Sequence, residues 1–460
     1  MFLRFRVANH ASIRDEQELS LIALDQHEDL SVTDIPGTDQ QALPVTAIYG
    51  ANASGKSNVI DALAFMRRVV VESHQRWLPD DPIDRRLFLL DEESSTQPST
   101  FIADFALSDL RYEYGFSLTE TAVREEWLYA WPERRRRVLF ERTDDGQIKY
   151  GASFPSRREH PVGRPRSNSL LVSAGAAEEH PTLLLIYRWF RAGLYPALNH
   201  TFDERLSLTM TEFSGEHAAA ALGLMRFADF GVEDVRITAP VADYFAETLE
   251  QVTRASRVLQ DGIKRESYDA FNTAMAVIGP EVLRELADLE LTNPQALSQR
   301  LGLVHRARRG STKTTLPLDN ESSGTRTWLG LIGPLLIALR YGTVLIVDEL
   351  DAHLHPHLAA RLIGLFQARS TNPHGAQLIF NTHDVTLMSR STEYRLHRDQ
   401  IHFAEKGSTD GSTRLYPLTE FARVRDNLDN LERWYLSSRL GAVPVFHDSL
   451  LAELAETLAG

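Results

Sequence analysis

The feature that most constrains this chain is a glycine-bounded loop between a short apolar strand and a helix. Val45–Tyr49 is an apolar run that ends in a glycine, and Asn58–Val71 carries apolar residues at helical spacing. Between them, Gly50-Ala51-Asn52-Ala53-Ser54-Gly55-Lys56-Ser57 fits the pattern G-x-x-x-x-G-K-[ST] in full. Strand, tight loop and helix in direct succession predict an α/β fold with a phosphate-binding loop.

The residue types in this loop suit a nucleoside triphosphate. Gly50 and Gly55 let the backbone curl so that successive N–H groups converge on phosphate oxygens. Lys56 supplies a positive charge to the β- and γ-phosphates, the Ser57 hydroxyl is a ligand for Mg²⁺, and the following helix adds its positive dipole end. We therefore predict ATP and Mg²⁺ as cofactors. The loop residues expected to contact them are Gly50, Asn52, Ser54, Gly55, Lys56 and Ser57.

A second strand ends in two carboxylates. Thr343–Val347 is a continuous apolar run, which is typical of a buried parallel strand, and Asp348 and Glu349 follow it. Ligands bind at the carboxyl ends of such strands. We predict that Asp348 holds Mg²⁺, and that Glu349 orients and deprotonates the attacking water. Beside the phosphate loop, this pair makes Mg²⁺-dependent ATP hydrolysis the leading reaction.

Polar residues follow one further strand. Leu378–Phe380 is apolar, and Asn381-Thr382-His383-Asp384 comes directly after it. A histidine at a strand end can donate a hydrogen bond to a γ-phosphate, so we predict a catalytic role for His383 beside Glu349 and Lys56. An ordinary surface histidine is the alternative.

Small hydroxyl residues and a glycine open the helix expected at Thr327–Arg340. The segment Glu321–Arg326 contains Ser322, Ser323 and Gly324, which form either an ordinary N-cap or a second anion cradle. A single γ-phosphate does not need two cradles from one chain. The second cradle therefore indicates that another copy of the chain supplies it.

Together these motifs resemble the ATP-binding-cassette ATPases of the RecF/SMC/OLD type among the bacterial AAA family ATP-binding proteins. The matching segments are Gly50–Ser57 for Walker A, 322–325 for a variant signature, Thr343–Glu349 for Walker B, Leu350-Asp351 for the D-loop and His383 for the switch histidine. Asn58 and the Phe5–Ile13 stretch with Asn9 also match. The resemblance implies that Asn9, Asn58, Ser322, Ser323 and Gly324 contact nucleotide.

The resemblance implies a head-to-tail dimer in which the signature of one copy closes on the γ-phosphate held by the other. Two departures stand out. Leu170–His180, where a Mg²⁺-sensing glutamine is expected, contains none; Gln97 lies earlier in the chain, and the role stays unassigned. The signature lacks its leading leucine and second glycine, as in OLD-type proteins and in ATPase subunits of antiphage systems such as PARIS.

Composition excludes several classes of function. The 460 residues include no cysteine, which rules out disulfides, thiol nucleophiles and cysteine-ligated metals. The net charge of −14 argues against general polyanion binding. The apolar run Trp328–Leu339 is too short to span a bilayer, and Met1–Leu24 lacks the apolar core of a signal peptide. We therefore expect a cytoplasmic protein without membrane contacts.

The order of elements predicts three regions. Residues 1–175 form an ATPase N-lobe with N-terminal antiparallel strands and Walker A, 176–315 a helical insert, and 316–460 a C-lobe with signature, Walker B and switch histidine. Strand candidates in the N-lobe are Phe2–Ala8, Glu18–Ala23, Phe101–Leu107, Tyr112–Leu118, Glu126–Trp131 and Val138–Arg142. The expected fold is an ATP-binding-cassette P-loop head.

Other features leave alternatives open. No Asp-x-Asp follows His383, so a nuclease activity would belong to a partner protein. The histidines of His353–His357 form either a metal site or a loop and helix start. The basic residues Arg134–Arg137, Arg157, Arg158, Arg164, Arg166, Arg306, Arg308, Arg309 and Lys313 give either solvated charge or a nucleic-acid contact. The tail Asn427–Pro444 either packs in the core or docks a partner.

These observations favour an ATPase that assembles as a homodimer or higher oligomer. By resemblance, it acts as the sensor or switch of an antiphage defence pair and controls a separate effector, a nuclease encoded nearby. The alternatives are a RecF-like DNA repair or DNA-binding ATPase and a nucleotide-gated scaffold with little turnover.

Overall fold

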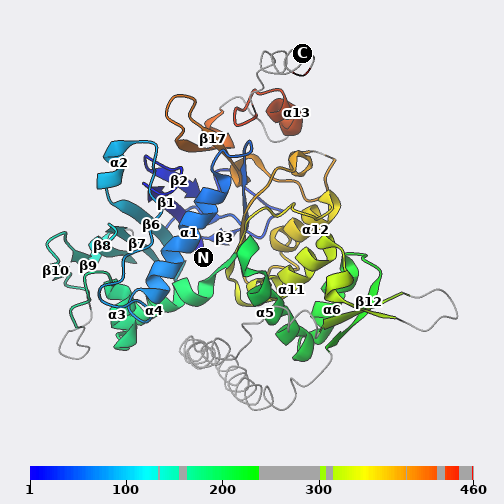
Figure 1. Ribbon diagram of the computed structural model, residues 1–460, viewed down its shortest axis with the longest axis horizontal. Helices are drawn as coiled ribbons and strands as arrows, with labels where there is room; N and C mark the ends of the chain where they lie inside the picture. Colours follow the sequence, from blue (N-terminus) through cyan, green and yellow to red (C-terminus); the bar gives the residue numbers. More distant parts are fainter. Residues whose placement is uncertain are drawn as a thin grey trace.

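The computed structural model contains two large β-sheets with helix α1 (Lys56–Glu72) between them and a group of helices on the other face of one sheet (Figure 1). The residues that the structure describes are 1–132, 135–154, 163–237, 301–306, 314–389, 391–421, 430–444 and 458.

The central sheet is parallel except at one edge. In spatial order its strands are β11 (Leu194–Ala197), β15 (Val344–Val347), β16 (Gln377–Asn381), β5 (Val45–Tyr49), β17 (Ile401–Lys406) and the antiparallel β18 (Thr413–Pro417). Every residue of β5, β15 and β16 is buried, as expected for strands covered on both faces. The strand before the phosphate loop and the strand before Asp348 are thus separated only by β16.

The second sheet is antiparallel. Its strands, in spatial order, are β10 (Ile148–Tyr150), β9 (Arg137–Arg142), β8 (Val123–Trp131), β7 (Leu110–Leu118), β6 (Ser99–Leu107), β1 (Phe2–Ala8) and β2 (Gln17–Ser20). The six strands predicted from alternating patterns are all present, with ends shifted by a few residues. The predicted α/β fold with N-terminal antiparallel strands is confirmed.

Helix α1 packs its apolar residues between the two sheets. Val59, Leu63 and Met66 lie in one core with Phe101 and Phe116 of the antiparallel sheet. The opposite face of the parallel sheet is covered by α5 (Phe202–Ser214), α6 (Ala218–Phe227), α11 (Ser323–Tyr341) and α12 (Pro356–Gln367). A helix on each face of the parallel sheet holds the carboxyl ends of its strands in fixed positions.

The middle of the chain differs from the sequence expectation of a helical region with few strands. It contains α3 (Leu171–Ala177), α4 (Pro181–Arg188), α5 and α6, but also β11, which is an edge strand of the central sheet. A small antiparallel sheet of β12 (Val232–Ile237), β13 (Leu301–His305) and β14 (Thr315–Pro317) follows. A four-residue strand that contains Pro196 is too short to show a period. Residues 238–300 lie outside the described part, so the domain limits stay a prediction.

The remaining elements are short. They include β3 (Thr33–Asp34), β4 (Gln41–Ala42), α2 (Glu92–Thr96), α13 (Leu431–Leu436), a π-helical turn at Trp189–Gly193 and several 3-10 turns. Leu431, Tyr435 and Leu440 are buried, and the Tyr435 ring stacks on Phe403 of β17 at 5.4 Å between ring centroids. The described part of the C-terminal tail therefore packs in the core; Leu428 lies outside the described residues.

Candidate functional site

The phosphate loop requires its two bounding glycines. Gly55, at the start of α1, has a φ of 101°, and a Cβ there would collide with Thr413 Oγ1 of β18. At Gly50 a Cβ would collide with the carbonyl oxygen of Ala404. The N-terminus of α1 has no side-chain cap, so its first N–H groups are left for a ligand.

A hydroxyl network supports the loop from behind. Thr413 Oγ1 donates to the carbonyl oxygen of Ser54 at 2.9 Å and lies 2.6 Å from Ser12 Oγ. Asn58 Nδ2 donates to the same Ser12 Oγ at 2.6 Å. The Asn58 amide therefore links the loop to the N-terminal segment; its predicted nucleotide contact stays a prediction.

Lys56 is held inside the phosphate loop. Its side chain is buried, and Nζ donates to the carbonyl oxygens of Gly50 and Ala51 at 3.0 Å each. Burial lowers the Lys56 pKa to about 8, although Asp351, Glu349 and Asp348 act in the opposite direction. Phosphate oxygens would give this cation stronger, charge-assisted partners than two carbonyls.

One side chain joins the phosphate loop to the acidic strand end. Asn381 Nδ2, at the end of β16, donates to Asp348 Oδ1 at 2.6 Å and to Ser57 Oγ at 3.2 Å. Asn381 Oδ1 accepts from the backbone N–H of Glu349. Glu349 has a left-handed backbone with a φ of 56°. Three residues, from one helix and from the end of the neighbouring strand β15, thus meet at the amide at the end of β16.

The arrangement fits a Mg²⁺ ion. Ser57 Oγ and Asp348 Oδ1 are hard oxygen ligands bonded to the same nitrogen, so both can reach one small cation. Mg²⁺ usually takes only one or two protein oxygens beside phosphates and waters. Over the described ranges, no cluster of three or more His, Cys, Asp and Glu residues forms a separate metal site.

His383 lies at the edge of this group. Its backbone N–H donates to the Asp351 carboxylate at 3.2 Å. Partial burial lowers the pKa of the imidazole, and the Lys56 charge lowers it further. His383 is therefore a neutral imidazole at pH 7, able to donate one hydrogen bond.

The proposed signature residues lie at the start of α11. Ser322 is the N-cap, and its Oγ accepts from Thr325 N at 3.1 Å. Gly324 approaches the carbonyl oxygen of His353, where a Cβ would come within 2.6 Å. Within this chain, Ser322 contacts Thr325 of α11, and Gly324 lies against the His353 carbonyl, in the loop after Glu349. The ordinary N-cap is present, and the second cradle remains a prediction.

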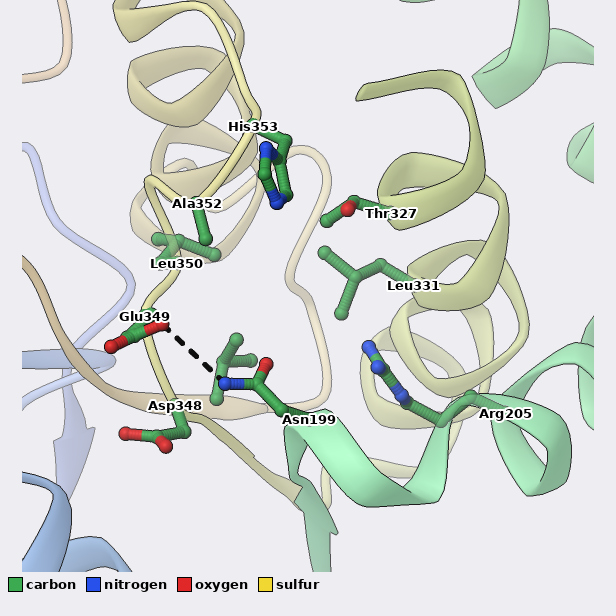
Figure 2. A pocket seen from close by; sticks show the side chains of 10 residues that line it. Asn199, Arg205, Thr327, Leu331, Asp348, Glu349, Leu350, Ala352 and His353 are labelled. Atoms are coloured by element: carbon green, nitrogen blue, oxygen red, sulfur yellow. Dashed lines mark hydrogen bonds between the residues drawn. The ribbon is translucent and has the colours of Figure 1, made fainter. Parts of the chain in front are cut away.

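A cavity of about 130 Å³ beside Glu349 is lined by residues whose place in the site the sequence did not indicate (Figure 2). Asn199 follows β11, and its Nδ2 donates to Glu349 Oε2 at 3.4 Å. Arg205 of α5 also lines the cavity and is buried. The central sheet is connected to α5 through β11 and Asn199. Leu170–His180, where the resemblance places a glutamine, forms α3 and the turn that leads to α4. A polar amide after an apolar Leu-Tyr-Pro-Ala run was the available signal.

Asn9 has a different environment from the one expected. Its side chain is buried, with Nδ2 donating to the carbonyl oxygens of Ser94 and Gln97 at 2.8 and 2.9 Å. Asn9 Oδ1 accepts from Phe88 N at 3.2 Å. Because donors and acceptor are all engaged within the protein, Asn9 holds the segment before β6 in this structure.

The histidine run forms the loop and the start of α12, and one described basic residue makes contacts within the chain; the nucleic-acid alternative for the other basic residues stays a prediction. His355 caps α12, with Nδ1 accepting from His357 N at 3.2 Å. Arg166 donates to the carbonyl oxygens of Ser73 and His74 at 3.0 and 2.8 Å, which are structural contacts. The residues of the basic set outside the described ranges are Arg134, Arg157, Arg158, Arg308, Arg309 and Lys313.

A phosphate loop that leads from a strand into a helix, one strand away from an acidic strand end, defines a P-loop nucleoside triphosphatase fold. The chain belongs to the family described as "AAA domain, putative AbiEii toxin, Type IV TA system", whose sequence model matches residues 45–389. It is therefore a member of an ATPase family whose fold binds nucleotide.

Solved structures also show similarity. An Smc head domain from Pyrococcus furiosus, with an extended coiled coil and bound to the C-terminal domain of ScpA, is 12% identical, with a TM-score of 0.35 over 92% of this chain and 98% of that one. An Smc head domain with a coiled coil and joint from Pyrococcus yayanosii is 12% identical, with a TM-score of 0.35 over 92% and 99%. No curated protein sequence matches this chain. Among the described residues, no helix is both long and apolar enough to cross a membrane.

Proposed function

We propose that this chain is a Mg²⁺-dependent ATPase that acts as the switch subunit of an antiphage defence pair. The observation that carries the ATPase proposal is the convergence of Ser57, Asp348 and Glu349 on the Asn381 amide. A phosphate loop, a cation ligand and a carboxylate base are thereby held together by one side chain.

The residues divide the chemistry among them. Lys56 exchanges its two loop carbonyls for the β- and γ-phosphate oxygens. Ser57 and Asp348 would hold Mg²⁺, which when bound neutralises phosphate charge. The Glu349 carboxylate, held by Asn199 at 3.4 Å, accepts a proton from the attacking water. Neutral His383 donates a hydrogen bond to the γ-phosphate.

Two copies are proposed to complete the site. Gly324 contacts the carbonyl of His353 in its own chain. The small residues Ser322 and Ser323 stand beside it at the N-terminus of α11. Such a terminus attracts anions. A head-to-tail dimer, or a larger oligomer, would bring it to the γ-phosphate bound by the other copy. ATP would then stabilise assembly, and hydrolysis would release it.

The switch role rests on the family. The family description names a putative toxin and a toxin–antitoxin system, which fits a protein that works with a second component. By the resemblance to ATPase subunits of antiphage systems, we propose that the second component is an effector, a nuclease encoded nearby. ATP-driven assembly would hold or release that effector when a phage trigger arrives.

ATP turnover of the purified chain, alone and with double-stranded DNA, tests the proposal. Lys56→Ala and Glu349→Gln are expected to abolish turnover, and to abolish phage protection in cells that carry the whole gene pair. Slow turnover that ignores DNA supports the switch role. Turnover that rises many-fold with DNA would favour the RecF-like alternative, and full protection by both variants would refute ATP-driven switching.

A further inference from the structure

We propose that Asn381 is a positioning residue that makes Mg²⁺ binding and the conformation of Glu349 mutually dependent. The inference rests on the proposed Mg·ATP site and deepens it. Its basis is that the two ends of one amide serve two different parts of that site.

The nitrogen end donates to the two oxygens that would hold the cation. Nδ2 lies 2.6 Å from Asp348 Oδ1 and 3.2 Å from Ser57 Oγ, the two oxygens that would hold Mg²⁺. An amide NH₂ group donates hydrogen bonds and offers no lone pair to a metal. An ion bound to both oxygens would compete for the lone pairs that accept from this nitrogen, and its positive charge would repel the amide hydrogens that point at them. The amide must therefore rotate away when the ion binds.

The oxygen end restrains Glu349. Oδ1 accepts the backbone N–H of Glu349, whose φ of 56° lies in a region that residues other than glycine rarely adopt. This bond is one of the contacts that keep the turn after β15 in place. Any rotation of the amide that clears the cation position also removes this acceptor.

The backbone of Asn381 cannot supply the movement instead. All five residues of β16 are buried between β15 and β5, and the Asn381 carbonyl accepts from Leu350 N at 3.1 Å. Rotation of the side chain is thus the available response. Cation binding is coupled through it to release of the Glu349 N–H, so the base leaves its resting conformation only in the loaded site.

The test is Mg²⁺ affinity, measured by calorimetry on the full chain saturated with a non-hydrolysable ATP analogue. In Asn381→Ala, the ion no longer displaces an amide from two hydrogen bonds, and we expect it to bind roughly tenfold more tightly. Asn381→Asp also removes the NH₂ group, and it should bind Mg²⁺ more tightly still. Weaker or unchanged Mg²⁺ binding in Asn381→Ala would overturn the inference.

A matched control comes from Asn372, which is also buried and donates through Nδ2 to the carbonyl oxygens of Phe366 and Ala376 at 2.8 Å each. Asn372→Ala should lose stability but keep the wild-type Mg²⁺ affinity, which separates the coupling from mere destabilisation.

Hydrogen exchange of the peptide that contains Glu349 gives a second readout. In the wild type, exchange should become faster when Mg²⁺ is added to the analogue complex. In Asn381→Ala it should be fast with and without Mg²⁺, and in Asn381→Asp it should stay slow without Mg²⁺, because a carboxylate still accepts the N–H. Equal exchange in the wild type and Asn381→Ala without Mg²⁺ would also overturn the inference. Failure of the wild type to bind the analogue at all would instead refute the ATP site itself.

Discussion

Gly324 at the start of α11 lies directly against the backbone carbonyl of His353, in the loop that follows Glu349. A Cβ at position 324 would stand 2.6 Å from that oxygen, a distance that side-chain carbons do not adopt. The small residue in the proposed signature is therefore required by a contact within its own chain. Movement of the signature helix is linked to the D-loop by this contact.

We expect Gly324→Ala to force the two segments apart. The overpacking should cost about 1–3 kcal/mol of unfolding free energy and should lower ATP turnover by displacing the loop that carries Glu349. Thermal unfolding and steady-state turnover measure both effects. Gly223→Ala in α6 is the matched control, because nothing lies within 4 Å of its Cβ position. That helical substitution should stabilise by about 0.5–1 kcal/mol and leave turnover unchanged; an equal loss in both variants would contradict the steric argument.

The hydroxyl of Thr413 is expected to stabilise the phosphate loop. Thr413→Val keeps the side-chain shape but removes the donor to the Ser54 carbonyl and the partner of Ser12. A buried carbonyl left unpaired costs about 1–3 kcal/mol, so both stability and affinity for an ATP analogue should fall. Thr413→Ser retains the hydroxyl and should restore most of the affinity. Equal binding by Thr413→Val and the wild type would show that the network does not shape the loop.

ATP binding should weaken at alkaline pH through Lys56. With a pKa of about 8 in the phosphate loop, Lys56 is charged below that pH and neutral above it. The bound phosphates need the charged form, so binding above about pH 8 must include proton uptake. The apparent Kd should rise by up to about tenfold per pH unit there and stay level below.

Calorimetry in two buffers with different ionisation enthalpies checks this proton uptake directly. About half a proton should be taken up per ATP analogue bound at pH 8, and almost none at pH 6.5. Lys56→Arg cannot lose its charge in this range and should show no such dependence, even if it binds less tightly. The same alkaline loss in Lys56→Arg would assign the effect to another group.

The sequence predicted the elements that carry the loop and the acidic strand end because those signals are local. The phosphate-loop pattern, the apolar run of β15 and the alternation in β1 and β6 each lie within a few residues, and all three strands are present. Local signals of this kind fix what an element is.

The sequence did not predict which amides organise the site. Asn381 meets Ser57, 324 residues away, and Asn199 meets Glu349, 150 residues away. An asparagine carries no local sign of its distant partners, so the sequence indicates a role for His383 but not for Asn381. Asn9 is the opposite case: it matches a family position, and the structure shows its amide donating to the carbonyl oxygens of Ser94 and Gln97, so its nucleotide contact stays a prediction.

The last prediction concerns stability in acid and arises from His402 in β17. Burial lowers the His402 pKa to about 4, against an ordinary value of 6.5, and Asp399 only partly opposes the shift. Its Nδ1 has no hydrogen-bond partner among the described residues. Between about pH 6.5 and pH 4, His402 binds a proton in the unfolded chain but stays neutral in the folded chain. The free energy of unfolding should therefore fall by about 1.4 kcal/mol per pH unit from this group.

His402→Gln removes the titrating ring from the same buried position. Chemical denaturation at pH 7, 6, 5 and 4.5 should show a shallower loss of stability for the variant, with the two curves closest together at low pH. Other groups contribute equally to both proteins and cancel in the difference between them. Since the folded pKa is depressed, the His402 contribution must be present above pH 6.5 and lost below it. A difference between the two proteins that stays constant with pH would exclude His402 as the source.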